Sequence, residues 1–318
     1  MTSMKIESKH TVKGKYMLRK LDEAGNIIYE SDWFDNLITN AGLDMLGGAH
    51  GAAAFQTVTQ DCYVGTGTAT PSVGDTTLTT YLANTSTMSP GTQSFVSGSP
   101  SYYTNTFTYT FAVGVATGTI SEIGVGITTN NTGPIYTLFS HALIVTSGGT
   151  PTTITILSNE SLQVLYQLQL YNDTTTNTYS VSISGTTYTG SYLLEGYGTR
   201  GQSGNSYSVG FPLASNGTGS PLIYLSNGTI SGTVSGFISG TVLSYGALYG
   251  YGTYTVGTYT NTITWTIPVG DGNLSGGISA FAVEPTICAY QFSVSPAIPK
   301  DSNHILTLEI SFSWASGI

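Results

Sequence analysis

The 318-residue sequence has few charged residues. They make up 8% of the chain, against roughly 25% in an average soluble protein. The formal net charge of −9 argues against nucleic-acid binding through a basic face. Most of the few cations gather at the start of the chain. This favours a solvated first strand, then docking on an acidic partner surface, and only then DNA contact. The clustered cations are Lys5, Lys9, Lys13, Lys15, Arg19 and Lys20.

Cysteine and histidine are also rare, which limits the chemistry that the chain can carry. Cys62 and Cys288 are far apart in the sequence and fit no metal or redox spacing, so we expect two small buried apolar side chains and no disulfide framework. The four histidines do not stand at the spacing of metal ligands. We therefore expect no metal and no cofactor.

Catalytic patterns are missing as well. The sequence contains no G-x-S-x-G, P-loop or dinucleotide motif. Ser140 and His141 are adjacent, and in a strand they would point to opposite faces. Glu122 and Glu160 are the carboxylates that a weaker, third hypothesis of a polysaccharide-degrading enzyme would use. We expect a protein without enzymatic activity.

Long apolar runs are absent too. No stretch of 18 apolar residues exists, so we expect no membrane span. The first ten residues, MTSMKIESKH, are charged and lack the apolar centre of a signal peptide. We expect a protein that is made in a cytoplasm and acts where it is assembled.

The abundant residues point to an all-β fold. Glycine (40 residues) and tyrosine (22 residues) accompany many threonines, valines and isoleucines, which suit pleated strands joined by tight turns. Residues 14–34 predict a β-hairpin with a turn at 22–26. A short helix is predicted after it, capped by Asp35 or Asn36 and ended by Gly47-Gly48. Residues 75–82 suggest a further turn of helix.

An internal repeat divides the chain. The segment from Phe107 matches the segment from Ile263, so that Phe111 falls on Ile267 and Gly118 on Gly272. Later, SNESLQVLYQLQL from Ser158 matches SNHILTLEISFSW from Ser302, with every second residue apolar in both copies. We predict two tandem, related β-sandwich-like domains, 1–172 and 173–318, the second with Gly/Tyr-rich loops.

Several motifs of the first half resemble those of minor structural proteins of tailed-bacteriophage virions, a group of tail, tail-fibre, collar and neck proteins. They are WFDNLITNAGL at 33–43, VGTGTATP at 64–71 followed by DTTL at 75–78, SEIG at 121–124, FSHALI at 139–144 and the strand at 162–171. The likeness covers most of residues 12–172. The Gly/Tyr-rich stretch that follows departs from it.

The resemblance implies a virion structural component, assembled in the host cytoplasm, that docks on portal, neck, tail or capsid subunits. Copies would form a homo-oligomer, and docking would use residues of about 12–46: Lys15, Arg19, Trp33, Phe34, Leu37 and Ile38. The alternative is a receptor-binding fibre that recognises a host surface glycan or protein. Its contacts would be Tyr245, Tyr249, Tyr251 and Tyr254, although packing within their own domain or against a neighbouring subunit is the favoured interpretation of these side chains.

Overall fold

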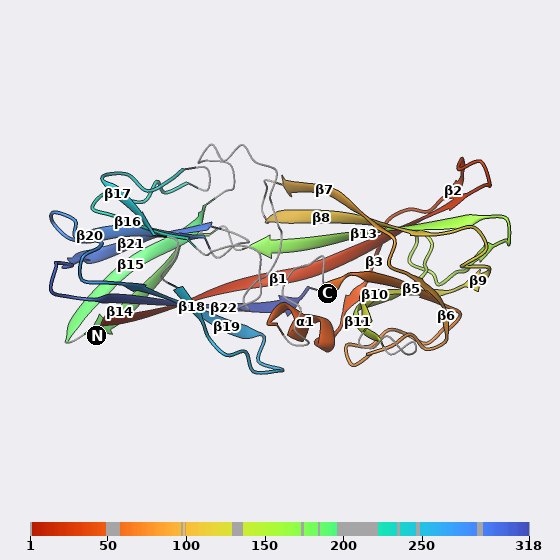
Figure 1. The fold of residues 1–318 in the computed structure, drawn as a ribbon, viewed down its shortest axis with the longest axis horizontal. Helices are drawn as coiled ribbons and strands as arrows, with labels where there is room; N and C mark the ends of the chain where they lie inside the picture. The colour runs from red at the N-terminus through yellow and green to blue at the C-terminus, as the bar shows by residue number, and fades with distance from the viewer. Residues whose placement is uncertain are drawn as a thin grey trace. The chain divides into compact units, whose positions relative to one another are not determined.

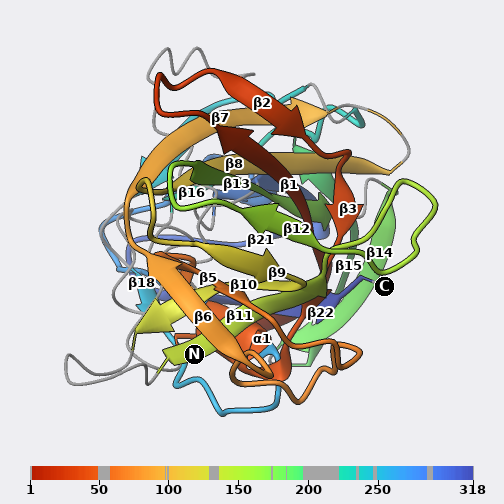
Figure 2. The ribbon, with the colours of Figure 1, turned by 90° about the vertical axis from the view of Figure 1, so that its right-hand side faces the viewer.

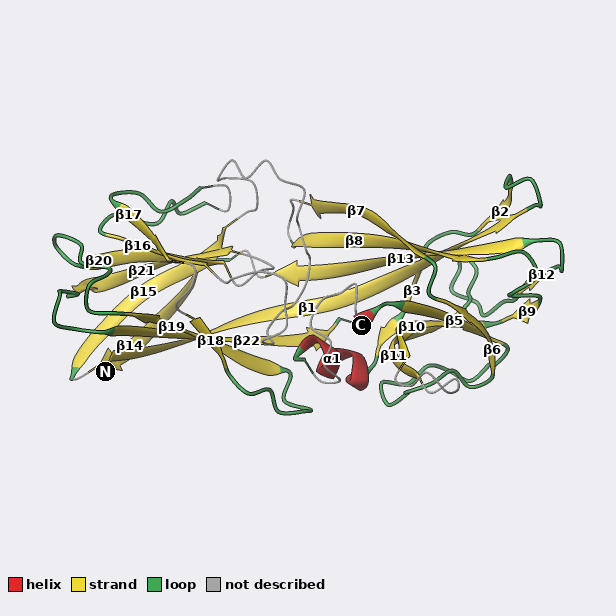
Figure 3. Cartoon of the chain, in the orientation of Figure 1, coloured by secondary structure: helices red, strands yellow, loops and turns green. Residues whose placement is uncertain are grey.

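A computed structural model describes residues 2–48, 58–96, 98, 100–128, 136–172, 175–183, 185–195, 222–233, 236–245, 249–284 and 289–317. Strands dominate the described chain, and the fold is all-β and of the β-sandwich type, with a short helix, α1 (Asn40–Leu46) (Figures 1 and 3). This confirms the predicted fold class.

The chain forms two compact units. The N-unit comprises Thr11–Val96, Tyr102–Tyr171 and Trp314–Ile318, and the C-unit comprises Met1–His10, Ser97–Ser101 and Asn172–Ser313. The division near residue 172 lies at the predicted domain boundary, but each terminal segment belongs to the unit that the other half of the chain mainly builds. Strand β1 (Thr2–Leu21) therefore contributes residues to both units, and so does β22 (Leu306–Ser316).

Two layers of antiparallel strands build the N-unit (Figure 2). One layer has the order β1-β13-β8-β7, with β2 and β3 also paired to β1, and the other has the order β4-β11-β10-β5-β6. A small pair, β9 with β12, completes the unit. The bounds are β2 (Ile27–Glu30), β3 (Phe34–Asp35), β4 (Leu37–Ile38), β5 (Asp61–Gly65), β6 (Tyr81–Thr85), β7 (Met88–Val96), β8 (Ser101–Phe111), β9 (Gly118–Ile120), β10 (Glu122–Thr128), β11 (Tyr136–Leu143), β12 (Ile154–Ile156) and β13 (Ser161–Asn172).

Alternating apolar residues form the core between these layers. The predicted alternation of β13 is confirmed, because its alternate side chains from Leu162 to Leu170 are all fully buried. Polar contacts link the layers inside this core: the Tyr16 hydroxyl lies 2.7 Å from Ser140 Oγ, and the Tyr109 hydroxyl donates to the Thr59 carbonyl. Buried tyrosines are tolerated because such partners satisfy their hydroxyl groups.

The C-unit repeats this topology. Its strands have the orders β22-β19-β18 and β15-β21-β20-β16-β17, which match β13-β8-β7 and β4-β11-β10-β5-β6 strand for strand, with β14 added beside β15. The bounds are β14 (Asn177–Ile183), β15 (Thr186–Glu195), β16 (Leu222–Ser226), β17 (Val242–Tyr245), β18 (Tyr249–Tyr251), β19 (Thr260–Ile267), β20 (Ile278–Glu284) and β21 (Ala289–Ile298).

Matched residues of the two copies occupy equivalent positions. Phe111 ends β8 and Ile267 ends β19, as the alignment of the two segments predicts. Gly118 and Gly272 both have positive φ, 142° and 71°, which explains a glycine at this place in each copy. The alternate residues from Leu306 to Trp314 are buried, like those of β13.

Two local predictions were wrong. The helix begins later than predicted: Thr39 caps it, and its hydroxyl accepts the Gly42 N–H, while Leu37 and Ile38 pair with β11 as a short strand. The edge of β11 thus supplies hydrogen-bond partners to the backbone of residues 37–38, and a helix at 36–38 would not make these bonds. Residues 75–80 form no helical turn, because the N–H groups of Thr79 and Thr80 bind a buried carboxylate instead.

Gly42 should be the least replaceable residue of α1. A Cβ at this position would lie 2.9 Å from the Phe139 Cα and still closer to the Phe139 carbonyl oxygen, so helix and strand would have to separate. We expect Gly42→Ala to lower the free energy of unfolding by about 2 kcal/mol, as overpacking does. Urea unfolding measures this, with Gly74→Ala as the control because its Cβ would have no heavy atom nearer than 3.9 Å. Equal midpoints for the two variants would refute the close packing.

Candidate functional site

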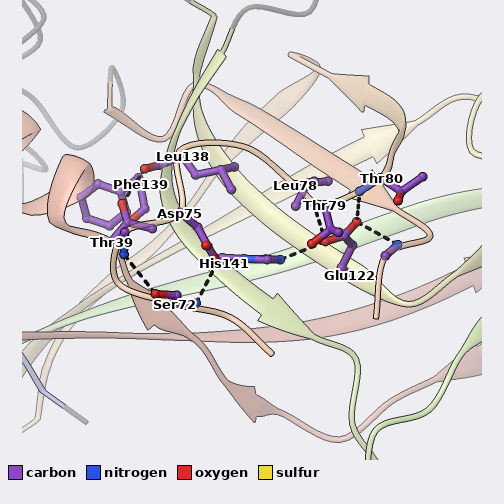
Figure 4. A network of polar contacts seen from close by, with 12 residues as sticks. Thr39, Ser72, Asp75, Leu78, Thr79, Thr80, Glu122, Leu138, Phe139 and His141 are labelled. Atoms are coloured by element: carbon purple, nitrogen blue, oxygen red, sulfur yellow. Dashed lines mark hydrogen bonds and ion pairs between the residues drawn. The ribbon is translucent and has the colours of Figure 1, made fainter. Parts of the chain in front are cut away.

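The candidate site of the N-unit is a polar network around the buried carboxylate of Glu122, at the start of β10 (Figure 4). Its Oε1 accepts hydrogen bonds from the N–H groups of Gly67 (2.8 Å) and Thr80 (2.7 Å). Its Oε2 accepts one from Thr79 N–H (3.0 Å) and lies 3.1 Å from His141 Nε2. Both oxygens are therefore saturated by groups of the protein itself.

His141, on β11, connects this carboxylate to a second one. Its Nδ1 lies 2.7 Å from Asp75 Oδ2, which also accepts the N–H of Ser72. Two carboxylates facing the two ring nitrogens favour the imidazolium form, which donates from both. Ser140 points to the other face of β11, toward Tyr16, as the sequence predicts for adjacent strand residues.

This network fastens the loop between β5 and β6 to the sheet. Gly67, Asp75, Thr79 and Thr80 all belong to that loop, and a Cβ at Gly67 would collide with the Glu122 carboxylate. A glycine is required there because the loop backbone approaches the carboxylate directly. The Ser121 hydroxyl adds a bond to the Gly67 carbonyl (2.6 Å).

The beginning of α1 is attached to the same region. The Thr39 hydroxyl donates to the Leu138 carbonyl (2.6 Å), and Thr39 N–H donates to the Phe139 carbonyl. Asn40 N–H donates to the carbonyl of Val73 in the loop (2.7 Å). Four motifs that are distant in the sequence, at 33–43, 64–78, 121–124 and 139–144, thus meet in one hydrogen-bonded structure.

Burial and hydrogen bonding oppose each other at Glu122. Burial by itself would raise the pKa of the carboxyl group, but His141 and three backbone N–H groups hold that pKa down at about 2. Burial would likewise lower the pKa of His141, and the facing carboxylates of Glu122 and Asp75 raise it instead. We call this network of Glu122, His141 and Asp75 with the β5–β6 loop the Glu122 clamp. The Glu122 carboxylate has no lone pair left to act on a substrate.

Glu160 does not complete a catalytic pair with Glu122. Its carboxylate binds Lys20 Nζ (2.8 Å) and accepts the N–H of Leu157, so the two glutamates share no partner among the described residues. Lys20 is the main cause of the lowered pKa of Glu160.

The C-unit holds the equivalent loop with a neutral side chain. Gln291 on β21 is fully buried; its Oε1 accepts Ser231 N–H (2.7 Å), and its Nε2 donates to the carbonyls of Thr233 (2.9 Å) and Gly236 (3.2 Å). At the position matched to Glu122, the C-unit has Gly276 with a φ of 83°. The sequence analysis did not identify Gln291. The one feature of the sequence that could have indicated it is an amide side chain between apolar residues of a strand.

The predicted docking residues differ in their partners and in their exposure to solvent. Lys15 pairs with Asp35 of β3 (3.5 Å) and Arg19 with Glu30 of β2 (2.5 Å), so both cations face carboxylates of the chain itself. Phe34 and Ile38 are buried, Leu37 is half-buried, and Trp33 is exposed. A docking role for these residues stays a prediction, and Trp33 is the one whose side chain is open to a partner.

The predicted contact tyrosines of the C-unit are half-buried. The Tyr245 hydroxyl accepts Gly272 N–H (2.6 Å), and the rings of Tyr249 and Tyr251 meet edge to face at 5.5 Å. Tyr254 lies in the loop after β18. Ligand contact by these residues stays a prediction.

Other residues singled out in the sequence have ordinary places. Cys62 is buried, as predicted, whereas Cys288 and His50 lie outside the described residues. His304 binds Asp301 (2.7 Å), and His10 is buried near Tyr290 and Phe312. Within the described ranges, no helix has the length and hydropathy of a membrane span. Those ranges also contain no metal-binding group of three or more His, Cys, Asp or Glu residues.

Comparisons of the chain with known protein families, with curated protein sequences and with solved structures gave no match.

The clamp predicts an asymmetric response to two Glu→Gln substitutions. Glu122→Gln leaves the imidazolium and three backbone N–H groups without their carboxylate, and we expect a loss of about 3 kcal/mol in the free energy of unfolding. Glu30→Gln removes an equivalent charge from the more exposed pair with Arg19 and should cost about 0.5 kcal/mol. Urea unfolding of the full chain distinguishes them, and similar losses in both variants would contradict a structural clamp.

The clamp should also give stability a two-sided pH dependence. The lowered pKa of Glu122 stabilises the fold above its ordinary value of 4.5, and this contribution is lost as pH falls toward 2. The raised pKa of His141 stabilises the fold below its ordinary value of 6.5, and this contribution is lost as pH rises through the raised pKa. Urea midpoints measured against pH should show a shallower acidic decline in Glu122→Gln, where Asp22 and Glu160 still contribute, and a shallower alkaline decline in His141→Gln. Curves parallel to that of the unchanged protein would refute the assignment.

Proposed function

We propose that this chain is a structural component of a tailed-bacteriophage virion, a tail-fibre, collar or neck protein, that docks on the particle through its N-terminal region. The observation that carries the proposal is the convergence of the motifs. Segments that resemble this group of proteins at four separate places are joined by the Glu122 clamp and the cap of α1. The resemblance therefore extends to residues that hold one folded unit together.

The surface and the architecture favour permanent assembly. Only 8% of the residues are charged, and the three hairpin cations Lys15, Arg19 and Lys20 are paired with carboxylates of the chain itself. Among the described strands, β7 and β18 lie at the ends of the sheet order, and a neighbouring subunit can cover the backbone groups of such edge strands. We propose a homo-oligomer in contact with portal, neck, tail or capsid subunits, located in the virion.

A non-catalytic role is part of this proposal. The fully buried carboxylate of Glu122 uses its lone pairs on the loop that it holds and on His141. Glycan recognition by Tyr245, Tyr249, Tyr251 and Tyr254 is less well supported, since all four side chains are half-buried.

Purified particles of the tailed phage that encodes this chain should contain it in a fixed copy number. Quantitative mass spectrometry gives the ratio to the major capsid protein, and a cryo-electron-microscopy map gives its position. We expect a symmetric ring or fibre whose N-units contact another virion protein. Absence of the chain from purified particles would overturn the proposal, and contacts made only by the tyrosine-bearing unit would favour the receptor-binding alternative.

A further inference from the structure

Six large apolar side chains are exposed at one end of the N-unit. Each is between 44% and 54% exposed. They come from three segments: the β1–β2 hairpin, the turn after β8 and the turn before β13. We call five of them the tip surface: Ile27, Tyr29, Val113, Val115 and Leu157; Ile28 points to the opposite face of β2.

Contacts of Glu160 bring these three segments together. Its carboxylate binds Lys20 Nζ of the hairpin (2.8 Å) and Leu157 N–H (2.8 Å), and its carbonyl accepts the N–H of Gly114 (3.2 Å), between Val113 and Val115. Tyr29 lies directly opposite Lys20 in the β1–β2 register, so the two side chains share a face. Figure 1 shows the hairpin and the start of β13 at the same end of this unit.

The hairpin at the tip has a fixed shape. The Asp22 carboxylate accepts the Asn26 N–H (2.8 Å) and the Asn26 side-chain amide (3.0 Å), and Gly25 takes a φ of 83°. These bonds also lower the pKa of Asp22, so the turn stays charged and closed at neutral pH. A preformed tip loses little conformational entropy when it binds.

Charge indicates what the tip surface meets. Arg19 and Lys20 are bound to Glu30 and Glu160, so the cations near the tip are neutralised. Glu23 and Asp32 flank the exposed strand β2, are themselves exposed, and have no ion pair among the described residues. The free charge around the apolar residues is therefore negative.

A second copy of this chain complements that charge poorly. Among the lysines and arginines whose side chains the structure describes, Lys9 alone is exposed. The others pair with carboxylates, cover the Tyr171 ring (Lys13) or, in the case of Lys300, are buried against Asn273 and Asp301.

We infer that the tip surface is the docking site for a different protein of the particle, one that presents an apolar groove edged by lysine and arginine side chains. Apolar contact supplies the affinity, and the carboxylates of Glu23 and Asp32 orient the tip in the groove. This inference rests on the proposed virion function and names the surface and the partner chemistry that the function needs.

The test uses particles assembled without this chain, to which the purified full-length chain is added back. Bound copies per particle are counted by quantitative mass spectrometry over a range of chain concentrations. We expect Tyr29→Ser and Leu157→Ser each to weaken binding about tenfold, since each removes a large apolar contact. Val256→Ser is the matched control, because Val256 is 69% exposed but belongs to the C-unit. Urea midpoints verify that every variant folds.

Charge is tested separately with the double variant Glu23→Lys, Asp32→Lys. We expect it to bind the particles at least tenfold more weakly. We also expect added salt to weaken the binding of the unchanged chain to the particles. Stronger binding of the double variant would show that the groove of the partner is edged by acidic side chains, and it would overturn the inferred partner chemistry.

The remaining outcomes separate the two levels of the argument. If the unchanged chain does not bind the particles, the proposed function fails. If it binds and the tip variants bind equally well, the function stands and the tip surface is not the docking site. If analytical ultracentrifugation shows self-association that the tip variants abolish, the occupant is a second copy and the inference is wrong.

Discussion

A carboxylate without water must find its partners in the protein, and the N-unit is organised around that requirement. Glu122 is completely buried and obtains four donors, three from the backbone of one loop and one from His141. An unpaired buried charge is so unfavourable that the loop has little freedom to move away. A long irregular segment thereby becomes part of the rigid sandwich, and the cap of α1 rests on it through Asn40 and Val73.

The repeat shows that the clamp is one of two solutions to the same problem. Both units have a long loop between equivalent strands, β5 to β6 and β16 to β17. The N-unit holds its loop with an ionised network, whereas the C-unit uses the neutral amide of Gln291. A neutral amide does not titrate, so the contacts of Gln291 with its loop do not depend on pH as those of Glu122 do. Two copies of one topology have thus acquired different electrostatics.

The distribution of charge connects the fold to the proposed assembly. A chain with so few ionisable groups uses most of its hairpin cations in internal pairs, which leaves a tip that is apolar and locally negative. The inward-facing carboxylates stabilise the unit, and the inferred docking assigns the orientation of the partner to the exposed Glu23 and Asp32. In the proposed docking, stability and recognition depend on separate residues, so separate variants measure the two properties.

Local pattern determined much of the architecture. Alternating apolar residues in 162–170 and 306–314 predicted two buried strands, and the order of matched segments predicted the repeat, because a strand's periodicity is written in its own residues. The start of α1 and the non-helical course of 75–80 were not predictable in this way, since both depend on partners elsewhere: the edge of β11 and the carboxylate of Glu122. The clamp itself joins residues 75, 122 and 141, and Lys20 contacts Glu160 across a still longer separation in the sequence. Only the tertiary structure decides which of these distant side chains come into contact, because hydrogen bonds and ion pairs act over a few ångströms in space whatever the separation along the chain.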